Sequence, residues 1–144
     1  MDETGVIAAI FAKLKADTTL RGATYLGSSA PGYGIYRHNF LPDNPSFPRV
    51  TLEFIGGPTD RPSSWEDNIC VVTVRVYHGN PPKILARIEQ LLNQRTQVIT
   101  ATDAEIRQFR KTAKGADLWD DEFQVHYRLD NYTLRYRLFG GINT

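Results

Sequence analysis

Three histidines, His38, His78 and His126, are the first candidates for chemistry in this sequence, because imidazole titrates near neutral pH and binds transition metals. A metal or acid–base site encoded in a short stretch of chain places histidines at close spacings such as His-x-His or His-Glu-x-x-His. These three lie far apart along the chain, on or near predicted strands. We therefore interpret them as surface or strand-end residues rather than as a site.

Carboxylates offer a second chemistry, metal-dependent cleavage of phosphodiesters, around Asp43, Glu53 and Glu105. The segment "PDNP" at 42–45, followed by "TLEFI", is faintly similar to the Pro-Asp…Glu-x-Lys arrangement of restriction-type nucleases. Ile55 stands where that arrangement needs a lysine, so Glu53 is better explained as an exposed strand residue. A small metal-dependent nuclease stays an alternative.

No nucleophile elbow, phosphate-binding glycine loop or dinucleotide fingerprint occurs in the sequence. The chain therefore offers no recognisable catalytic residues, bound metal or cofactor, and we do not expect an enzyme. The last part of the chain interleaves tyrosines with arginines, a composition that single-stranded nucleic-acid binders also use. Tyr132 and Tyr136 share a strand face with Leu134, however, which predicts that they lie in the core with the arginines outside.

Length and composition describe an ordinary globular chain. The 144 residues fit a single domain, 1–144, and 17 basic residues nearly balance 16 acidic ones. Cys70 is the one cysteine, which excludes an intrachain disulfide. No export signal and no apolar stretch of about 18 residues is present, so we expect a soluble protein with no membrane partner.

The first half of the chain predicts one helix and two strands. Apolar residues at three- and four-residue steps predict a helix over 5–16, and a Gly- and Pro-rich irregular stretch at 27–48 contains a short strand-like "GIYRH". Alternation of apolar and polar residues predicts a strand with one buried face over 49–54. The stretch 68–78 predicts a strand with one wholly apolar face and one mixed face, the first being Cys70, Val72, Val74 and Val76 and the second Ile69, Val71, Thr73, Arg75 and Tyr77.

The second half predicts a helix over 81–95, opened by two prolines and carrying an apolar stripe. The segment 101–112 fits a helix or an amphipathic strand, and we favour the strand. A polar turn is expected over 114–123, before strands within 124–139. The apolar residues of this stretch alternate in two different phases, first Val125, Tyr127 and Leu129 and then Tyr132, Leu134, Tyr136 and Leu138. A bulge or bend at Asp130 and Asn131 would switch the phase and keep both sets facing inward.

These elements predict an α+β fold, with a mainly antiparallel sheet of about four strands, two helices packed on one face, and long loops. The connection "GGPTDRPSSWEDN" at 56–68 is much longer than a hairpin needs, and such connections are often binding loops. Tryptophan is enriched at protein interfaces. A loop tryptophan folded over its own core is the equally simple alternative. The residues proposed for an interface are Arg61, Trp65, Glu66, Asp67 and Trp119.

The order of these features resembles the tail terminator, or tail completion, family of long-tailed bacteriophages. The resemblance covers about residues 5 to 139. It rests on an opening helix ending in "LKADTTLRGAT", then "GIYRHNFLPDNPSFPRVTLEF", then "WEDNICVVTVRVYHGNPPKILARIEQLL" and a closing "VHYRLDNYTLRYRLF". These parts form a pattern of elements and not a catalytic signature. The charged segment from 102 to 123 and the long excursion before residue 48 depart from the pattern.

The resemblance implies a structural protein of the virion, present in the host cytoplasm during assembly. It implies a homohexameric ring that caps the tail tube protein and offers its other face to a head-side connector or stopper protein. Genomic DNA would pass through the lumen without specific binding, which the near-neutral net charge tolerates. The 56–68 loop would dock on a neighbouring subunit or on tube subunits, with Trp65 as its anchor and Arg61, Glu66 and Asp67 as a polar rim. A connector or stopper at the head side is the alternative within the same class.

Overall fold

The computed structural model describes residues 4–27, 33–38, 48–55, 68–92, 99–100, 104–122 and 124–138. The helices are α1 (Thr4–Ala16), α2 (Thr18–Arg21) and α3 (Pro81–Leu92). The strands are β1 (Ile35–Arg37), β2 (Arg49–Ile55), β3 (Asn68–Tyr77), β4 (Ile99–Thr100), β5 (Ala104–Asp120) and β6 (Val125–Leu138).

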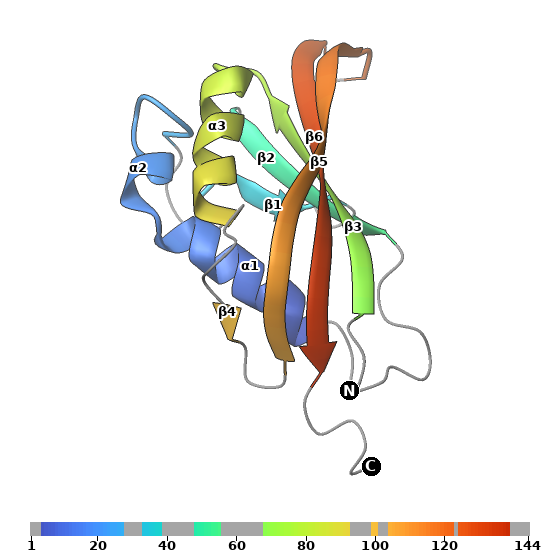
Figure 1. Ribbon diagram of the computed structural model, residues 1–144. Helices are drawn as coiled ribbons and strands as arrows, with labels where there is room; N and C mark the ends of the chain where they lie inside the picture. The colour runs from blue at the N-terminus through green and yellow to red at the C-terminus, as the bar shows by residue number, and fades with distance from the viewer. Residues whose placement is uncertain are drawn as a thin grey trace.

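The strands form one sheet in the order β1-β2-β3-β6-β5-β4, and the helices lie on one side of it (Figure 1). The predicted α+β class is confirmed. The expectation of about four strands is corrected to six, because the short β1 and β4 add to both edges. The sheet is mixed, since β1 runs parallel to β2 while the other pairs are antiparallel. A third short helix, α2, was also not expected.

The core lies between the helices and one face of the sheet. Alternate residues of β3 are buried there, as the pattern predicted: Cys70, Val72, Val74 and Val76. The apolar stripe of α3 packs on them through Ile84, Leu85, Ile88 and Leu92. Each such side chain contributes about 1.5–3 kcal/mol when fully buried, so this layer dominates the stability of the fold. Within the described ranges, no helix combines the length and the apolar character that a bilayer crossing requires.

The predicted bulge at Asp130 and Asn131 is wrong. β6 pairs with β3 without interruption from Tyr127 to Tyr136, so its two phases lie on opposite faces of the sheet. Asp130 therefore faces the helices, in phase with Tyr132, and is buried. The unbroken ladder is possible because this carboxylate finds a cation there, as described below.

The predicted polar turn over 114–123 is also corrected. β5 continues to Asp120, and it pairs with β6 as far as Asp120 opposite Val125. The strand at 104–112, which the sequence left ambiguous, is confirmed. The irregularities lie in β5, with register shifts between Ile106 and Gln108, Lys111 and Ala113, and Lys114 and Asp117. These bulges let a polar, glycine-containing strand follow the regular β6.

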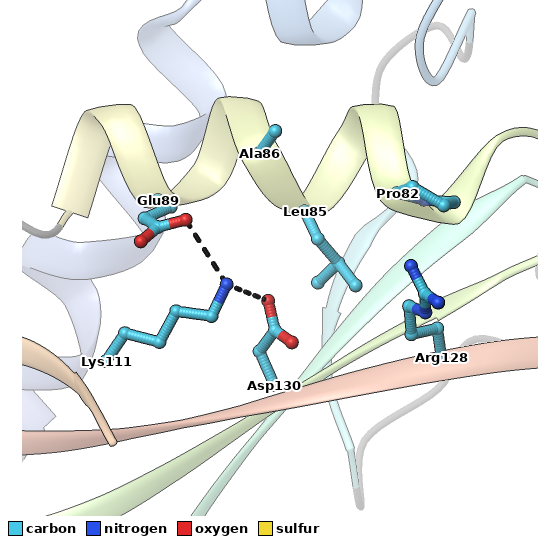
Figure 2. A pocket seen from close by; sticks show the side chains of 7 residues that line it. All are labelled: Pro82, Leu85, Ala86, Glu89, Lys111, Arg128 and Asp130. Atoms are coloured by element: carbon cyan, nitrogen blue, oxygen red, sulfur yellow. Dashed lines mark hydrogen bonds and ion pairs between the residues drawn. The ribbon is translucent and has the colours of Figure 1, made fainter. Parts of the chain in front are cut away.

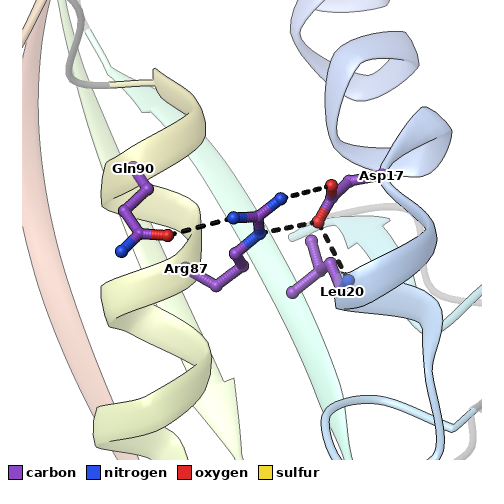
Figure 3. Close-up of polar contacts among 4 residues, drawn as sticks. All are labelled: Asp17, Leu20, Arg87 and Gln90. Atoms are coloured by element: carbon purple, nitrogen blue, oxygen red, sulfur yellow. Dashed lines mark hydrogen bonds and ion pairs between the residues drawn. The ribbon is translucent and has the colours of Figure 1, made fainter.

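Asp17 joins the N-terminal helices to α3 (Figure 3). Its carboxylate accepts a hydrogen bond from the Leu20 N–H at 2.9 Å, which caps α2. It also accepts two hydrogen bonds from Arg87, at 2.9 Å from Nε and 2.7 Å from Nη2. The Arg87 hydrogen bond lowers the Asp17 pKa, against an opposing effect of burial, and the Leu20 N–H lowers it further.

We expect Asp17→Ala to lower the free energy of unfolding by about 1–2 kcal/mol at neutral pH, because it removes a helix cap together with a bidentate ion pair. The lowered Asp17 pKa sets the pH dependence. Its stabilisation is complete above the ordinary aspartate pKa of about 3.9 and is lost as the pH falls through the folded-state value. Urea denaturation of both proteins between pH 7 and pH 2.5 tests this, with Asp17→Asn as the control that keeps a capping oxygen. A constant difference at all pH values would contradict it.

Candidate functional site

Trp119 is the one predicted interface residue within the part of the chain that the structure describes. It lies near the end of β5 and is 47% exposed, with its ring edge-on to His126 at a centroid distance of 4.7 Å. Arg61, Trp65, Glu66 and Asp67 lie outside the described residues. The expected docking of the 56–68 loop therefore stays a prediction.

Trp119 belongs to a group of exposed residues that we call the hairpin tip, Leu118, Trp119, Asp121 and Glu122. The β5–β6 ladder runs beyond the last β3 pair, Tyr77 opposite Tyr127, so the tip stands at one end of the sheet (Figure 1). Leu118 pairs with Tyr127 and Trp119 with His126, which places the two apolar side chains on opposite faces of the ribbon. Two exposed carboxylates follow in the turn. The tip is thus both apolar and acidic.

The sheet face away from the helices carries a second group, which we call the exposed face. Ile55, Val71, Thr133 and Arg110 form one row of cross-strand neighbours over β2, β3, β6 and β5, and Ile69 lies beside Arg135 in the next row. Three large apolar side chains are exposed here, with Ile69 at 53% and Ile55 at 50%. Ile55, Val71 and Ile69 are neighbours on this face, and such a contiguous apolar cluster is typical of a contact surface.

The β5–β6 end of the exposed face is basic. A groove of about 300 Å³ lies there, lined by Arg110, Lys111, Thr112, Thr133 and Arg135. Arg110 and Arg135 are both exposed. Arginine presents a rigid fork of donors that suits carboxylates, so this groove is suited to bind acidic groups.

At the end of the strands nearest the hairpin tip, the same sheet face is buried. Arg49 and Thr51 are buried there, and the Arg49 guanidinium lies over the Tyr77 ring at 5.0 Å. Burial lowers the pKa of Arg49, whereas the charges of Tyr77 and Asp120 oppose this shift. The accessible part of the face is therefore the half that carries Ile55, Ile69 and Val71.

A polar pocket of about 110 Å³ lies between α3 and the β5–β6 hairpin (Figure 2), lined by Pro82, Leu85, Ala86, Glu89, Lys111, Arg128 and Asp130. Lys111 Nζ lies 3.0 Å from Asp130 Oδ2 and 3.2 Å from Glu89 Oε2. Arg128 Nε lies 3.1 Å from Asp117 Oδ1. Burial lowers the pKa of Lys111, but its hydrogen bonds to Asp130 and Glu89 outweigh this and raise it. The charges compensate one another, so the network fastens α3 to the hairpin.

Two of the three acidic residues of the nuclease alternative, Glu53 and Glu105, lie at distant positions of the sheet. Glu53 lies three strands away from Glu105 in the sheet and six positions along it, because Glu53 is in line with Asn131 and Glu105 with Arg137. These steps correspond to about 14 Å across and about 20 Å along the strands. Glu53 instead pairs with Arg75 at 2.9 Å. Asp43 lies outside the described residues.

The histidines do not form a three-residue site either. His78 donates its N–H to the His126 carbonyl at 2.9 Å, which places these two residues at the hairpin end of the sheet, whereas His38 follows β1 and donates to the Leu52 carbonyl. In the described ranges, no three His, Cys, Asp or Glu residues gather as metal ligands would.

The tyrosines predicted to be core residues are buried, with Tyr132 at 0% and Tyr136 at 1% exposure. Tyr132 packs against Phe109 at a centroid distance of 5.0 Å, and burial raises its pKa. Neither ring is available to stack on a nucleic-acid base. Of the arginines predicted to lie outside, Arg135 is exposed and Arg128 is half-buried.

The sequence suggested Trp119 as an interface residue, which stays a prediction, and did not point to the exposed face. Ile69 and Val71 belonged to the strand face that the pattern described as mixed, and that was the available signal. Their alignment with Ile55, Arg110 and Arg135 depends on the registers of three strand pairs, which no local pattern encodes.

The fold is shared with a chain in a solved structure of the "Virion of native gene transfer agent (GTA) particle". The TM-score is 0.60 and the identity 16%, and the match covers 94% of this chain and 96% of the other. No protein-family model and no curated protein matches the sequence. The shared feature is thus the whole α+β architecture of a chain that was found within an assembled particle.

Proposed function

We propose that this chain is a structural protein of a phage-type virion and acts as a tail terminator, or tail completion, protein. In this role copies of the chain form a homohexameric ring that caps the tail tube and joins it to the head-side connector. The function is assembly without catalysis. It is exercised at the head–tail junction of the virion, after assembly in the host cytoplasm.

The observation that carries the proposal is the full-length structural similarity to a chain of a virion particle. The order of sequence features supports the terminator role within that class. The exposed apolar and charged surfaces of the sheet are suited to contacts with other subunits. A closed ring needs little affinity at each contact, because every subunit is held at two of them.

Negative-stain imaging of the purified protein, alone and with its tube protein, tests the proposal. We expect sixfold rings, or caps on tube ends. Particles that stay monomeric and leave the tube ends bare would overturn it. Binding to filled heads rather than to tubes would instead favour a head-side connector or stopper.

The 56–68 loop gives a second test of the same proposal. Shortening it to a tight turn is expected to abolish the joining of heads to tails of normal length while circular dichroism stays that of the wild type. Normal joining by the shortened chain would remove this loop from the contact surface but leave the ring untouched.

A further inference from the structure

We propose that the hairpin tip of one copy docks on the exposed face of the next copy, in a head-to-tail contact. The inference rests on the proposed ring and identifies the contact that would close it. It assigns a partner, a second copy of this chain, to two surfaces of the described structure.

The two surfaces are complementary in charge. The tip carries the exposed carboxylates of Asp121 and Glu122, and the exposed face carries the guanidiniums of Arg110 and Arg135. Carboxylates and guanidiniums form paired hydrogen bonds, and complementary charges at the edge of an interface fix its register.

They are also complementary in apolar character. Leu118 and Trp119 are exposed at the tip, and Ile55, Ile69 and Val71 are exposed on the face. Contact between these groups would remove large apolar surfaces from water, and a tryptophan set among aliphatic side chains is a frequent hot spot. Each surface thus offers both an apolar part and a charged part to the other.

The two surfaces of one copy cannot meet each other. Trp119 pairs with His126 and Ile69 with Arg135, and these β6 residues are nine positions apart. Nine positions along a strand correspond to about 30 Å. The complementary partner of each surface must therefore be another molecule. A contact between unlike surfaces repeats from copy to copy, and it closes into a ring when the rotation allows.

The test uses two charge-reversed variants, a tip variant (Asp121→Lys with Glu122→Lys) and a face variant (Arg110→Glu with Arg135→Glu). Each alone is expected to raise the protein concentration needed for self-association at least tenfold, measured by sedimentation velocity. An equimolar mixture of the two is expected to recover association, because in an alternating ring every tip again faces a surface of opposite charge. The chain carrying all four substitutions is expected to recover it as well.

Matched controls separate this contact from general charge effects and from unfolding. Lys83→Glu reverses an exposed charge on α3, in the helix layer, and is expected to leave association unchanged. Trp119→Ser is expected to weaken association at least tenfold without a charge change. Each variant must keep the wild-type melting temperature. Association of the wild type is expected to weaken with added salt.

The outcomes distinguish the contact from the function. If the variants associate like the wild type, or if the mixture does not recover, the head-to-tail contact is wrong even when tubes are capped. If the mixture recovers association but no protein binds tubes or heads, the contact stands and the terminator function fails.

Discussion

Gly115→Ala is expected to lower the free energy of unfolding by about 3 kcal/mol or more, because the site has no room for a methyl group. Gly115 lies in β5 between the register-shifted positions Lys114 and Asp117, where the strand presses against β6. A Cβ there would overlap the Leu129 carbonyl oxygen, and it would lie 2.8 Å from the carbonyl carbon and 2.9 Å from Leu129 Cγ. The obstacle is mostly backbone, which no change of rotamer relieves.

Urea denaturation followed by circular dichroism measures this loss. Ala113→Ser, at an exposed position of the same strand, is the matched control and is expected to change stability by less than about 0.5 kcal/mol. Wild-type stability of Gly115→Ala would mean that β5 can move away from Leu129. In that case the hairpin is not the rigid ribbon that the contact between copies requires.

Local pattern was sufficient to predict the elements that carry a one-sided apolar face. The stripes of α1 and α3 and the alternation of β3 specify both the element and the side that faces the core. The alternation of β2 located the strand, but Arg49 and Thr51 on its other face are buried as well. Residues 114–120 of β5 were wrongly predicted as a turn. The end of a hairpin has little core to cover, so it needs no apolar face, and its polar, glycine-containing sequence is typical of a turn. The two-residue β4 is held by pairing with β5 and leaves no pattern of its own. The strand-like "GIYRH" indicated β1, but nothing in it indicated the parallel pairing with β2.

Asp130 shows where the pattern was misjudged. The alternation of Asp130 with Tyr132 and Leu134 placed it on the core side, but a carboxylate among core residues is unfavourable unless it is paired. A bulge was expected here because it would keep both apolar sets of this stretch, those before and those after Asp130, facing inward. The compensating cation, Lys111, comes from the neighbouring strand, and their meeting depends on the β5–β6 register, to which the sequence gives no direct access.

Of the two candidate contact surfaces, only the hairpin tip could be suggested from the sequence. The exposed tryptophan could be proposed from residue type alone. The exposed face could not, because Ile55, Val71 and Arg110 come from three strands that are far apart in the chain. Gly115 and the Lys111–Asp130 pair both lie along the hairpin that carries Trp119 at its end. The residues that make this hairpin rigid therefore also hold Trp119 in place. Substitutions that loosen the hairpin should reduce assembly, as should substitutions of the exposed residues at its tip.

Lys111→Met is expected to be the second strongly destabilising substitution, at about 3–5 kcal/mol, because it leaves a buried carboxylate without its cation. The Asp130 side chain is 1% exposed and that of Lys111 14%, and the Lys111 Nζ atom lies between Asp130 and Glu89. The Gly115 N–H, 3.4 Å from Asp130 Oδ1, is too weak a donor to replace the ammonium.

The double variant Lys111→Met with Asp130→Leu separates two contributions to the free energy of unfolding. One is the net stabilisation by the ion pair, and the other is the destabilisation caused by leaving Asp130 buried without a cation. Replacing a buried pair by apolar groups is often neutral, so we expect the double variant to recover most of the loss seen in the single one. A double variant as unstable as Lys111→Met alone would contradict this, because it would mean that the methionine itself does not fit beneath α3.

The pH dependence gives an independent check on the same pair. The Lys111 pKa is raised by Asp130 and Glu89 despite burial, so the stability it provides is complete below the ordinary lysine value of about 10.4. That stability is lost as the pH rises through the higher folded-state value. The difference in free energy of unfolding between the wild type and Lys111→Met should therefore stay constant from pH 7 to about pH 10 and shrink above it. A difference that already falls near pH 8 would mean that the ammonium is not held by these two carboxylates, and that the hairpin is fastened to α3 by packing alone.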